Sequence, residues 1–166
     1  MKHRSYWLEL RAPEELRAKD FSLAGVVLAR LRGEESARAQ ELWREVGRGF
    51  WSEREDWPEA RWRSHLDDPE TWFGVALLVD GAVGFYEVVR ADGEARLEGF
   101  GLLPAWRGRG LGAGLLTAAT RQAFALGARR ISLHTATDDH PHALPNYLAR
   151  GYRVFREEPL ASPLRR

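Results

Sequence analysis

A proline and three alternating glycines separate an apolar, strand-like stretch at residues 95–103 from a helical pattern at residues 111–126. The glycines are Gly108, Gly110 and Gly112. The helical pattern ends at Gly127 and is followed by a second apolar stretch at residues 129–135. A strand, a helix and a strand in this order predict a β-α-β unit with parallel strands and a right-handed crossover.

The rest of the chain is expected to form mainly antiparallel strands joined by short turns. Alternating or β-branched apolar patterns predict strands at residues 6–10, 21–31, 72–79, 82–89 and 152–157. The dipeptides Asp80-Gly81 and Asp92-Gly93 have the composition of two-residue hairpin turns. Helices are predicted at residues 34–46, from Pro58 onward and at residues 143–150. The pattern indicates one mixed α/β domain.

Composition places the chain among ordinary soluble globular proteins. Of its 166 residues, 44% are hydrophobic and 30% are charged, which suffices for one packed core. The net charge of +1 is too balanced to indicate a nucleic-acid partner. The lack of cysteine excludes disulfides, thiolate metal ligands and cysteine nucleophiles. No apolar run approaches the roughly 18 residues of a membrane helix, so we expect a cytoplasmic protein without a membrane partner.

The glycine-rich segment has the features of a phosphate-binding loop. Glycines let the main chain approach a ligand closely, and the N–H groups at a helix N-terminus attract negative charge. Three known loop patterns compete for this segment. The P-loop pattern requires Gly-Lys followed by Ser or Thr, and the sequence Gly110-Leu111-Gly112 excludes it.

The second pattern is the dinucleotide fingerprint G-x-G-x-x-G/A. Gly108, Gly110 and Ala113 match it formally, and Asp138 follows near the end of the next strand. Two observations argue against it. Residues 104–107 separate the strand from the first glycine, whereas the fingerprint begins where its strand ends. Only 28 residues follow Asp138, too few for the rest of a doubly wound sheet.

The third pattern is Arg-x-x-Gly-x-Gly, carried by Arg107, Gly110 and Gly112 after an apolar strand and a proline. Residues 101–112 resemble the pyrophosphate motif of the GNAT superfamily of acyl-CoA-dependent N-acetyltransferases. Residues 146–152 resemble that family's helix-then-strand ending, in which a tyrosine stands four residues before a glycine. Two motifs in the right order around a β-α-β unit make the resemblance specific.

This resemblance implies a mixed, mostly antiparallel central sheet with a splayed parallel strand pair and flanking helices, formed as a single domain by residues 1–166. Acyl-CoA would lie between the splayed strands, with its pantetheine amides paired to the backbone of Leu102 and Leu103. The pyrophosphate would contact the loop residues Arg107, Gly108, Arg109, Gly110, Leu111 and Gly112. Either arginine of this loop could add a charge-assisted hydrogen bond.

In such a fold a neutral amine attacks the thioester directly. The reaction needs a proton acceptor, a donor for the oxyanion and an acid for the leaving thiolate. The resemblance assigns the acid to Tyr147, whose phenol can protonate a thiolate of lower basicity. The alternative for Tyr147 is a purely structural role as a core aromatic on a short helix.

Two glutamates are candidates for the proton acceptor. Glu98 lies in the middle of a predicted strand, where a carboxylate facing the core would be costly, and family members often carry a base on this strand. Glu87, on the neighbouring strand, is the second candidate. Both glutamates could instead face solvent and pair with Arg90 or Arg96.

Aspartates and histidines at residues 138–142 permit the hypothesis of a metal site. They lie on a proline-containing loop and lack the helical spacing of zinc ligands, so a capping role is favoured and no metal is expected. His140 stands seven residues before Tyr147, where the family often has an asparagine that contacts the cofactor. The histidine ring could donate a hydrogen bond in its place.

The resemblance also divides the chain into an acceptor-side region at about residues 1–71 and an acyl-CoA-binding region at about residues 72–157. Tryptophans are concentrated in or next to the first region, at Trp43, Trp51, Trp57, Trp62 and Trp72. Most are expected in the core, and one or two could line an aromatic acceptor site. Acidic residues nearby could attract a cationic amine, or could be solvated loop charges: Glu53, Glu55 and Asp56.

We therefore expect an N-acetyltransferase that uses acetyl-CoA to acylate a primary amine of a small molecule or a protein, with a homodimer as a possible assembly. A hypothesis of another class is a non-catalytic acyl-CoA sensor. A weaker one is a nicotinamide-dependent enzyme. The variant Tyr147→Phe separates the first two, because an enzyme should lose turnover while keeping its affinity for CoA.

Overall fold

The fold is known from a computed structural model that describes residues 3–160. Its strands are β1 (Arg4–Leu10), β2 (Val27–Leu31), β3 (Thr71–Leu78), β4 (Gly81–Ala91), β5 (Glu94–Leu102), β6 (Ile131–Ala136) and β7 (Arg153–Pro159). Its α-helices are α1 (Ser36–Gly47), α2 (Glu59–Asp67), α3 (Gly112–Ala125) and α4 (Ala143–Ala149). Short 3-10 turns are η1 (Pro13–Glu15), η2 (Gly33–Glu35) and η3 (Pro104–Trp106).

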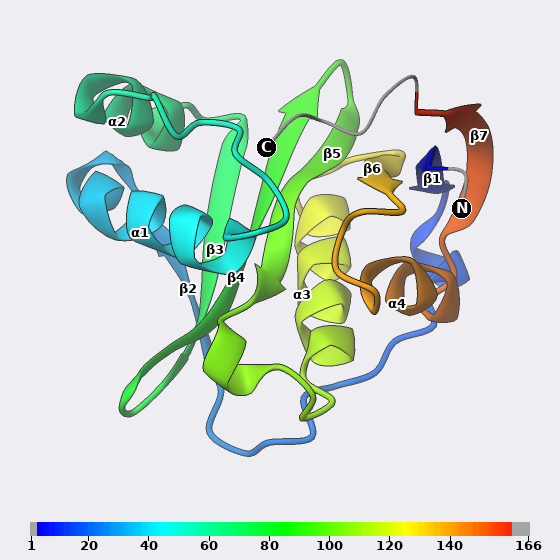
Figure 1. The fold of residues 1–166 in the computed structure, drawn as a ribbon, viewed down its shortest axis with the longest axis horizontal. Helices are drawn as coiled ribbons and strands as arrows, with labels where there is room; N and C mark the ends of the chain where they lie inside the picture. Colours follow the sequence, from blue (N-terminus) through cyan, green and yellow to red (C-terminus); the bar gives the residue numbers. More distant parts are fainter. Residues whose placement is uncertain (1–2, 161–166) are drawn as a thin grey trace.

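One sheet separates two helical layers (Figure 1). Its seven strands follow the order β2-β3-β4-β5-β6-β1-β7. Helices α1 and α2 pack on one face, around Trp43, Trp62 and Phe73. Helices α3 and α4 pack on the other face, where Leu115 and Tyr147 join a larger core. The mixed α/β fold with flanking helices is as the sequence predicts.

The strands β5 and β6 form the parallel pair that the β-α-β pattern predicts. Every other pair of neighbouring strands described is antiparallel. The parallel pairing is short, joining only Ala95 to Ile131 and Arg96 to Ser132. Beyond Arg96, β5 stays bonded to β4 but no longer to β6. The two strands therefore part toward their C-terminal ends.

A β-bulge alters the end of β5. The register with β4 slips between Glu87 and Val88, which leaves Glu98 as the extra residue of β5. The next residue, Gly99, lies against Trp43 of α1, where an added Cβ would come within 2.4 Å of the indole ring. Glycine is thus the residue that lets this tryptophan approach β5.

The predicted strand at residues 21–31 is wrong over its first part, because β2 begins six residues later. Phe21 packs instead on Gly114 of α3, where an added Cβ would lie 2.7 Å from its ring. The backbone N–H of Lys19 donates to Thr117 Oγ1 of the same helix at 3.0 Å. The segment is held by α3 rather than by the sheet, and no local pattern reveals that contact.

The two hairpin turns agree with the sequence to different degrees. Asp92 and Gly93 form the predicted two-residue turn, with φ of 55° and 76°. In the other hairpin Gly81 is already paired within β4, so the turn consists of Val79 and Asp80. It lies one residue earlier than predicted, next to an irregularity in the β3–β4 register.

The N-terminal strand β1 lies between β6 and β7 and is antiparallel to both. Both ends of the described chain therefore meet at one side of the sheet (Figure 1). Strand β1 is hydrogen-bonded to the edge of β6 that faces away from β5. Strand β6 therefore remains paired on that side even where it separates from β5.

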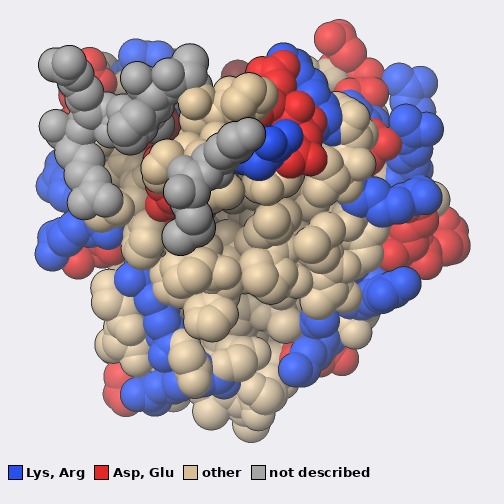
Figure 2. All heavy atoms as spheres, turned by 45° about the vertical axis from the view of Figure 1, so that its right-hand side comes forward, with Lys and Arg blue, Asp and Glu red and all other residues tan. Residues whose placement is uncertain are grey.

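Charged side chains of both signs are mixed over the surface in Figure 2, around an area of uncharged residues. Exposed ion pairs such as Arg121–Asp20 and Arg153–Glu15 belong to this mixed surface. Within residues 3–160, none of the helices has the length and apolar character needed to span a membrane.

Candidate active site

A cavity of about 410 Å³ lies where β5 has parted from β6. The end of β5, the glycine loop, the start of α3 and helix α4 form its walls, with residues after α1 on the far side. The predicted site residues that line it are Leu102, Arg107, Gly108, Gly110, Leu111, Gly112, His140 and Tyr147. Segments far apart in the sequence thus meet in one place.

Two predicted cofactor contacts lie outside this lining. The N–H of Leu103 donates to Val83 O at 2.8 Å, so this amide is used within the sheet and is not free for a ligand. Arg109 is exposed, and its Cζ lies 4.9 Å from the ring centroid of Trp106. Arg107 is therefore the arginine of the loop that faces the cavity.

Neither candidate proton acceptor reaches the cavity. Glu98 lies on an exposed part of β5 and pairs with Arg96 at 2.6 Å. Glu87 is fully buried, bonded by Arg54 at 2.7 and 3.0 Å and by His65 at 3.0 Å. Burial acts to raise the pKa of Glu87, but the hydrogen bonds from His65 and Arg54 and their charges outweigh it and lower this pKa. A carboxylate held ionised in this way is a weak proton acceptor.

The glycine loop presents unpaired backbone donors to the cavity. Gly108 and Gly110 both have φ of 75°, a conformation that glycine adopts without steric cost. Within the described chain, no backbone N–H from Gly108 to Leu111 donates to another backbone group. The first N–H groups of α3 also lack intrahelical acceptors because of their position. A row of free donors beside a helix N-terminus suits a diphosphate.

Arg107 adds a positive charge to the loop. Its Nη2 donates to Val46 O at the end of α1 at 3.0 Å, and its Cζ lies 5.4 Å from the ring centroid of Phe50. One edge of the guanidinium is thus fixed, while its other N–H groups remain available to an anion.

Tyr147 of α4 lies on the opposite wall. Its ring is buried between Phe100 and Tyr152, each at 6.0 Å between centroids. Its hydroxyl has no hydrogen-bond partner among residues 3–160. The residue lines the cavity, and the hydroxyl oxygen is not fully inaccessible to solvent. Burial, with a smaller contribution from Asp139, raises the pKa of Tyr147 above its ordinary value of 10.0. The phenol is therefore protonated at neutral pH and can donate.

His140 also offers a proton to the cavity. Its Nδ1 accepts from the N–H of His142 at 3.2 Å, so a neutral ring carries its proton on Nε2. Burial, together with the charges of Arg107 and His142, lowers the pKa of His140 and keeps the ring neutral. This tautomer suits the hydrogen bond to the cofactor that the resemblance implies.

The acidic and histidine cluster at residues 138–142 has a local structural role. Asp139 Oδ2 accepts from Thr135 Oγ1 at 2.5 Å and from the N–H of Ala136 at 2.9 Å, which closes the end of β6. In the described part of the chain, no three His, Cys, Asp or Glu side chains are grouped to hold a metal ion.

Sequence reasoning missed several residues that line the cavity: Asn146, Lys19, Val46 and Phe50. Trp51, one of the tryptophans considered for an acceptor site, lines it as well. The amide of Asn146 donates to Gly112 O at 3.1 Å and so ties α4 to the start of α3. Its place directly before Tyr147 was a usable signal. The other three, Lys19, Val46 and Phe50, come from loops and a helix end whose position depends on tertiary packing.

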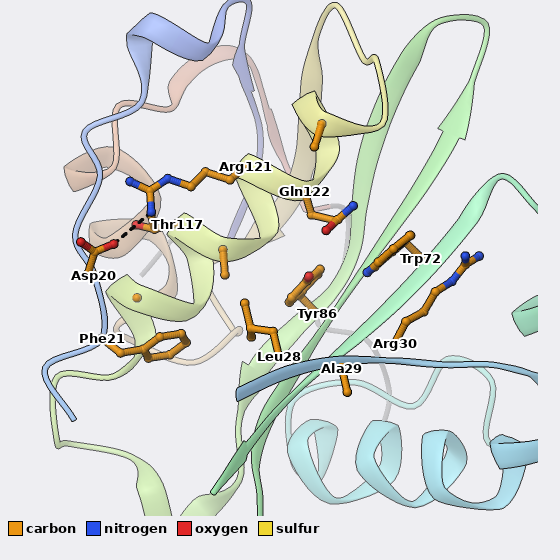
Figure 3. A pocket seen from close by; sticks show the side chains of 13 residues that line it. Asp20, Phe21, Leu28, Ala29, Arg30, Trp72, Tyr86, Thr117, Arg121 and Gln122 are labelled. Carbon is orange, nitrogen blue, oxygen red and sulfur yellow. Dashed lines mark hydrogen bonds and ion pairs between the residues drawn. The ribbon is translucent and has the colours of Figure 1, made fainter. Parts of the chain in front are cut away.

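A larger cavity, of about 540 Å³, lies between α3, β2 and β3. In Figure 3 the rings of Trp72 and Tyr86 lie beside Gln122, while Arg121 turns toward Asp20 and pairs with it at 2.9 Å. Trp72, one of the tryptophans considered for an acceptor site, lines this cavity, but none of the predicted catalytic or cofactor-binding residues does. Size therefore does not select the candidate site. The smaller cavity is the one lined by the glycine loop and by the side chains of Arg107, His140 and Tyr147.

Comparison with known sequences places the chain in a family. The sequence profile of the acetyltransferase (GNAT) family matches residues 36–152. The chain belongs to the GNAT acetyltransferase family. The matched region includes the β5–α3–β6 unit, the glycine loop and α4, so the family's region of similarity contains most of the cavity. No curated protein matches the chain.

Solved structures of N-acetyltransferases share the GNAT fold. A GCN5-related N-acetyltransferase from Sphaerobacter thermophilus has a TM-score of 0.75 and 20% identity, over 95% of this chain and 50% of that chain. Another, from Kribbella flavida, has a TM-score of 0.66 and 23% identity, over 98% and 61%. The chain thus spans half to about three fifths of these two relatives.

A third structure is of similar length to this chain. AAC(6')-Iy in complex with the bisubstrate analogue CoA-S-monomethyl-acetylneamine has a TM-score of 0.61 and 18% identity, over 86% of this chain and 98% of that chain. At these identities the three structures establish the fold. The GNAT-like fold that the sequence implied is confirmed.

Proposed function

We propose that this protein is an N-acetyltransferase that moves an acetyl group from acetyl-CoA to a primary amine. One observation carries the proposal: the free N–H groups of the glycine loop and the hydroxyl of Tyr147 line the same cavity. The first suit a diphosphate and the second suits a leaving thiolate, and an acyl-CoA contains both. Membership of the GNAT family supports the same assignment.

The chain's own residues would hold the donor at its two ends. The N–H groups from Gly108 to Gly112 would bind the diphosphate, and Arg107 would add a charge-assisted hydrogen bond. The Nε2–H of His140 would donate to the cofactor. When bound, acetyl-CoA supplies a thioester carbonyl that an amine can attack.

The amine nitrogen would form the new C–N bond as the C–S bond breaks, and Tyr147 would protonate the leaving sulfur. The proton lost by the new amide nitrogen would pass to solvent, from which the Tyr147 phenolate regains its own. Burial raises the pKa of this phenol, and it acts in the same direction on a thiolate formed beside it. The relative acidity of the two groups is therefore preserved in the cavity. The bond from Asn146 to Gly112 holds α4, and hence Tyr147, against the loop.

The amine would react in the neutral form that already exists in solution. Among the described residues that line the cavity, Asp139 is the one with a carboxylate side chain. Its Oδ2 already accepts hydrogen bonds from Thr135 Oγ1 and from the N–H of Ala136. Glu98 lies outside the lining and is paired with Arg96. The rate at low amine concentration should therefore rise with pH up to the pKa of the amine itself.

Calorimetric titration with acetyl-CoA, and separately with NADH, tests the donor. We expect micromolar binding of acetyl-CoA and none of NADH. Release of free CoA thiol in the presence of a panel of primary amines then tests catalysis. Binding of NADH without CoA would refute the proposal. Binding of acetyl-CoA with no thiol release from any amine would favour the non-catalytic sensor.

A further inference from the structure

Next to the candidate active site, aromatic rings surround a cation that belongs to the chain itself. The Cζ of Arg54 lies 3.9 Å from the ring centroid of Trp43, 4.5 Å from that of Trp57 and 5.4 Å from that of Trp62. We call these three indoles, with the carboxylate of Glu87, the cation cage. Only 10% of the Arg54 side chain remains exposed.

The floor of the cation cage carries the matching negative charge. Glu87 accepts two hydrogen bonds from Arg54, at 2.7 and 3.0 Å, and has no solvent exposure. His65 also contacts this carboxylate, at 3.0 Å. Aromatic faces attract cations, and cages of aromatic rings recognise cationic ligands in proteins. The carboxylate of Glu87 adds an opposite charge at the base of this cage. The same chemistry would accept a guanidinium or ammonium group from another molecule.

The occupant comes from a loop rather than from a helix or strand. Arg54 lies between α1 and α2 with φ of 71°, a left-handed conformation that is unfavourable for an arginine. A hollow of about 10 Å³ beside it is lined by Glu53 and Glu55 together with Arg44. The buried Nε1 of Trp62, on the same hollow, has no partner in the described chain.

The cation cage adjoins the cavity that holds Tyr147. Trp43 packs on Gly99 of β5, two residues before Gly101, which lines that cavity. The ring centroid of Trp43 is also 5.7 Å from that of Trp51, another lining residue. The loop that carries Arg54 therefore also supplies a wall of the active site.

We infer that the cation cage is a subsite for the acceptor, and that Arg54 is an internal occupant which a cationic acceptor displaces. The inference rests on the proposed function, and it names the acceptor class as an amine with a second positive group, a guanidinium or an ammonium. The reacting amine would extend into the cavity along Trp51, which lines both the hollow beside Arg54 and the cavity, while the second cation pairs with Glu87.

The first test measures binding and needs no activity. Arg54→Ala should bind ethylguanidinium saturably, with quenching of tryptophan fluorescence, at least tenfold more tightly than the parent protein does. The double variant Arg54→Ala/Glu87→Gln should lose this binding. Arg61→Met is the matched control, because Arg61 stacks on the outside of Trp57 at 4.1 Å without touching Glu87. It should behave as the parent protein.

The second test measures turnover by the unmodified protein and by Arg54→Lys. The kcat/KM of the unmodified protein for 4-guanidinobutylamine should exceed that for n-butylamine at least tenfold, and Arg54→Lys should alter this ratio while the Kd for acetyl-CoA stays constant. A ratio near one, or no ethylguanidinium binding by a folded Arg54→Ala, overturns the cation cage as an acceptor subsite. Failure to bind acetyl-CoA would instead overturn the proposed function, and the fluorescence titration would still decide whether the cage takes a cation.

Discussion

At the scale of single residues, burial acts on two ionisable side chains with opposite outcomes. The Tyr147 hydroxyl has no partner among the described residues, so burial raises its pKa and the neutral form persists. Glu87 is also buried but has Arg54 and His65 against its oxygens, so its pKa is lowered and the charged form persists. The partners of each group, rather than its depth, decide its charge.

Replacing Tyr147 by Phe tests its assignment as the acid. We expect kcat to fall by about 10² or more, because a positioned proton donor is lost, with the Kd for acetyl-CoA within twofold. Tyr152→Phe is the matched control, since its buried hydroxyl bonds Thr120 Oγ1 at 2.7 Å and does not line the cavity. Equal turnover in the Tyr147 variant and the parent protein would remove the assignment.

Replacing Glu87 by Gln should expose its contribution to stability through pH. The pKa of Glu87 lies below its ordinary value of 4.5 in the folded protein. Its stabilisation is therefore complete above the unfolded pKa and is lost as the pH falls through the folded pKa. Because the variant leaves Arg54 buried without a counter-charge, we expect a loss of about 3 kcal/mol in the free energy of unfolding at pH 7.

Urea denaturation at several pH values between 3 and 7 measures this loss. The difference between the parent protein and Glu87→Gln should be largest at pH 7 and should shrink at the acidic end. A difference that does not change with pH would show that the charge of Glu87 is not its source.

At the scale of elements, the glycine loop combines two separate requirements. Gly108 and Gly110 need left-handed backbone angles, although an added Cβ at either would meet no close neighbour. Their backbone conformation favours glycine, crowding within the protein does not require it, and the proposed phosphate ligand would add a need for close approach. The two requirements can be separated by comparing glycines that share only the first.

Gly110→Asp should lower the affinity for acetyl-CoA by at least 100-fold, because it places a negative charge among the phosphate-binding donors. Gly127→Asp is the control: Gly127 has φ of 89° at the opposite end of α3, where the nearest side chain is Arg90. Both variants should lose about 1–2 kcal/mol of stability from the left-handed conformation. Calorimetry that finds equal affinities in the two variants would contradict a role of the loop in binding phosphate.

At the scale of the whole molecule, the two sides of the sheet are joined weakly beside the cavity. β5 and β6 share two residue pairs, and beyond them the connection runs through α3 and the loops around the cavity. A ligand that contacts both the glycine loop and α4 would add a link across this parting. Binding should therefore stabilise the fold as a unit.

Acetyl-CoA at 100 times its Kd should raise the free energy of unfolding by about 2.7 kcal/mol. For a domain of this size, that corresponds to an increase in Tm of about 5–10 °C. Differential scanning calorimetry measures it, with Gly110→Asp as the variant that should not respond. An equal shift in that variant would place the binding elsewhere.

The sequence alone determined those features that depend on local chemistry. The alternation of apolar residues, the positive-φ turn at Asp92-Gly93 and the glycines before α3 each act over a few neighbouring residues, so the β-α-β unit and the loop were predictable. The spacing of Tyr147 from Gly151 was local as well.

Tertiary structure decided what depends on contacts between distant segments. The N-terminal strand β1 enters the sheet between β6 and β7, Phe21 packs on α3 instead of extending β2, and a bulge leaves Glu98 outside the cavity. The pairing of Glu87 with Arg54 belongs to the same class. These outcomes follow from competition among many long-range packing arrangements. A short stretch of sequence does not specify which distant segment will pack against it.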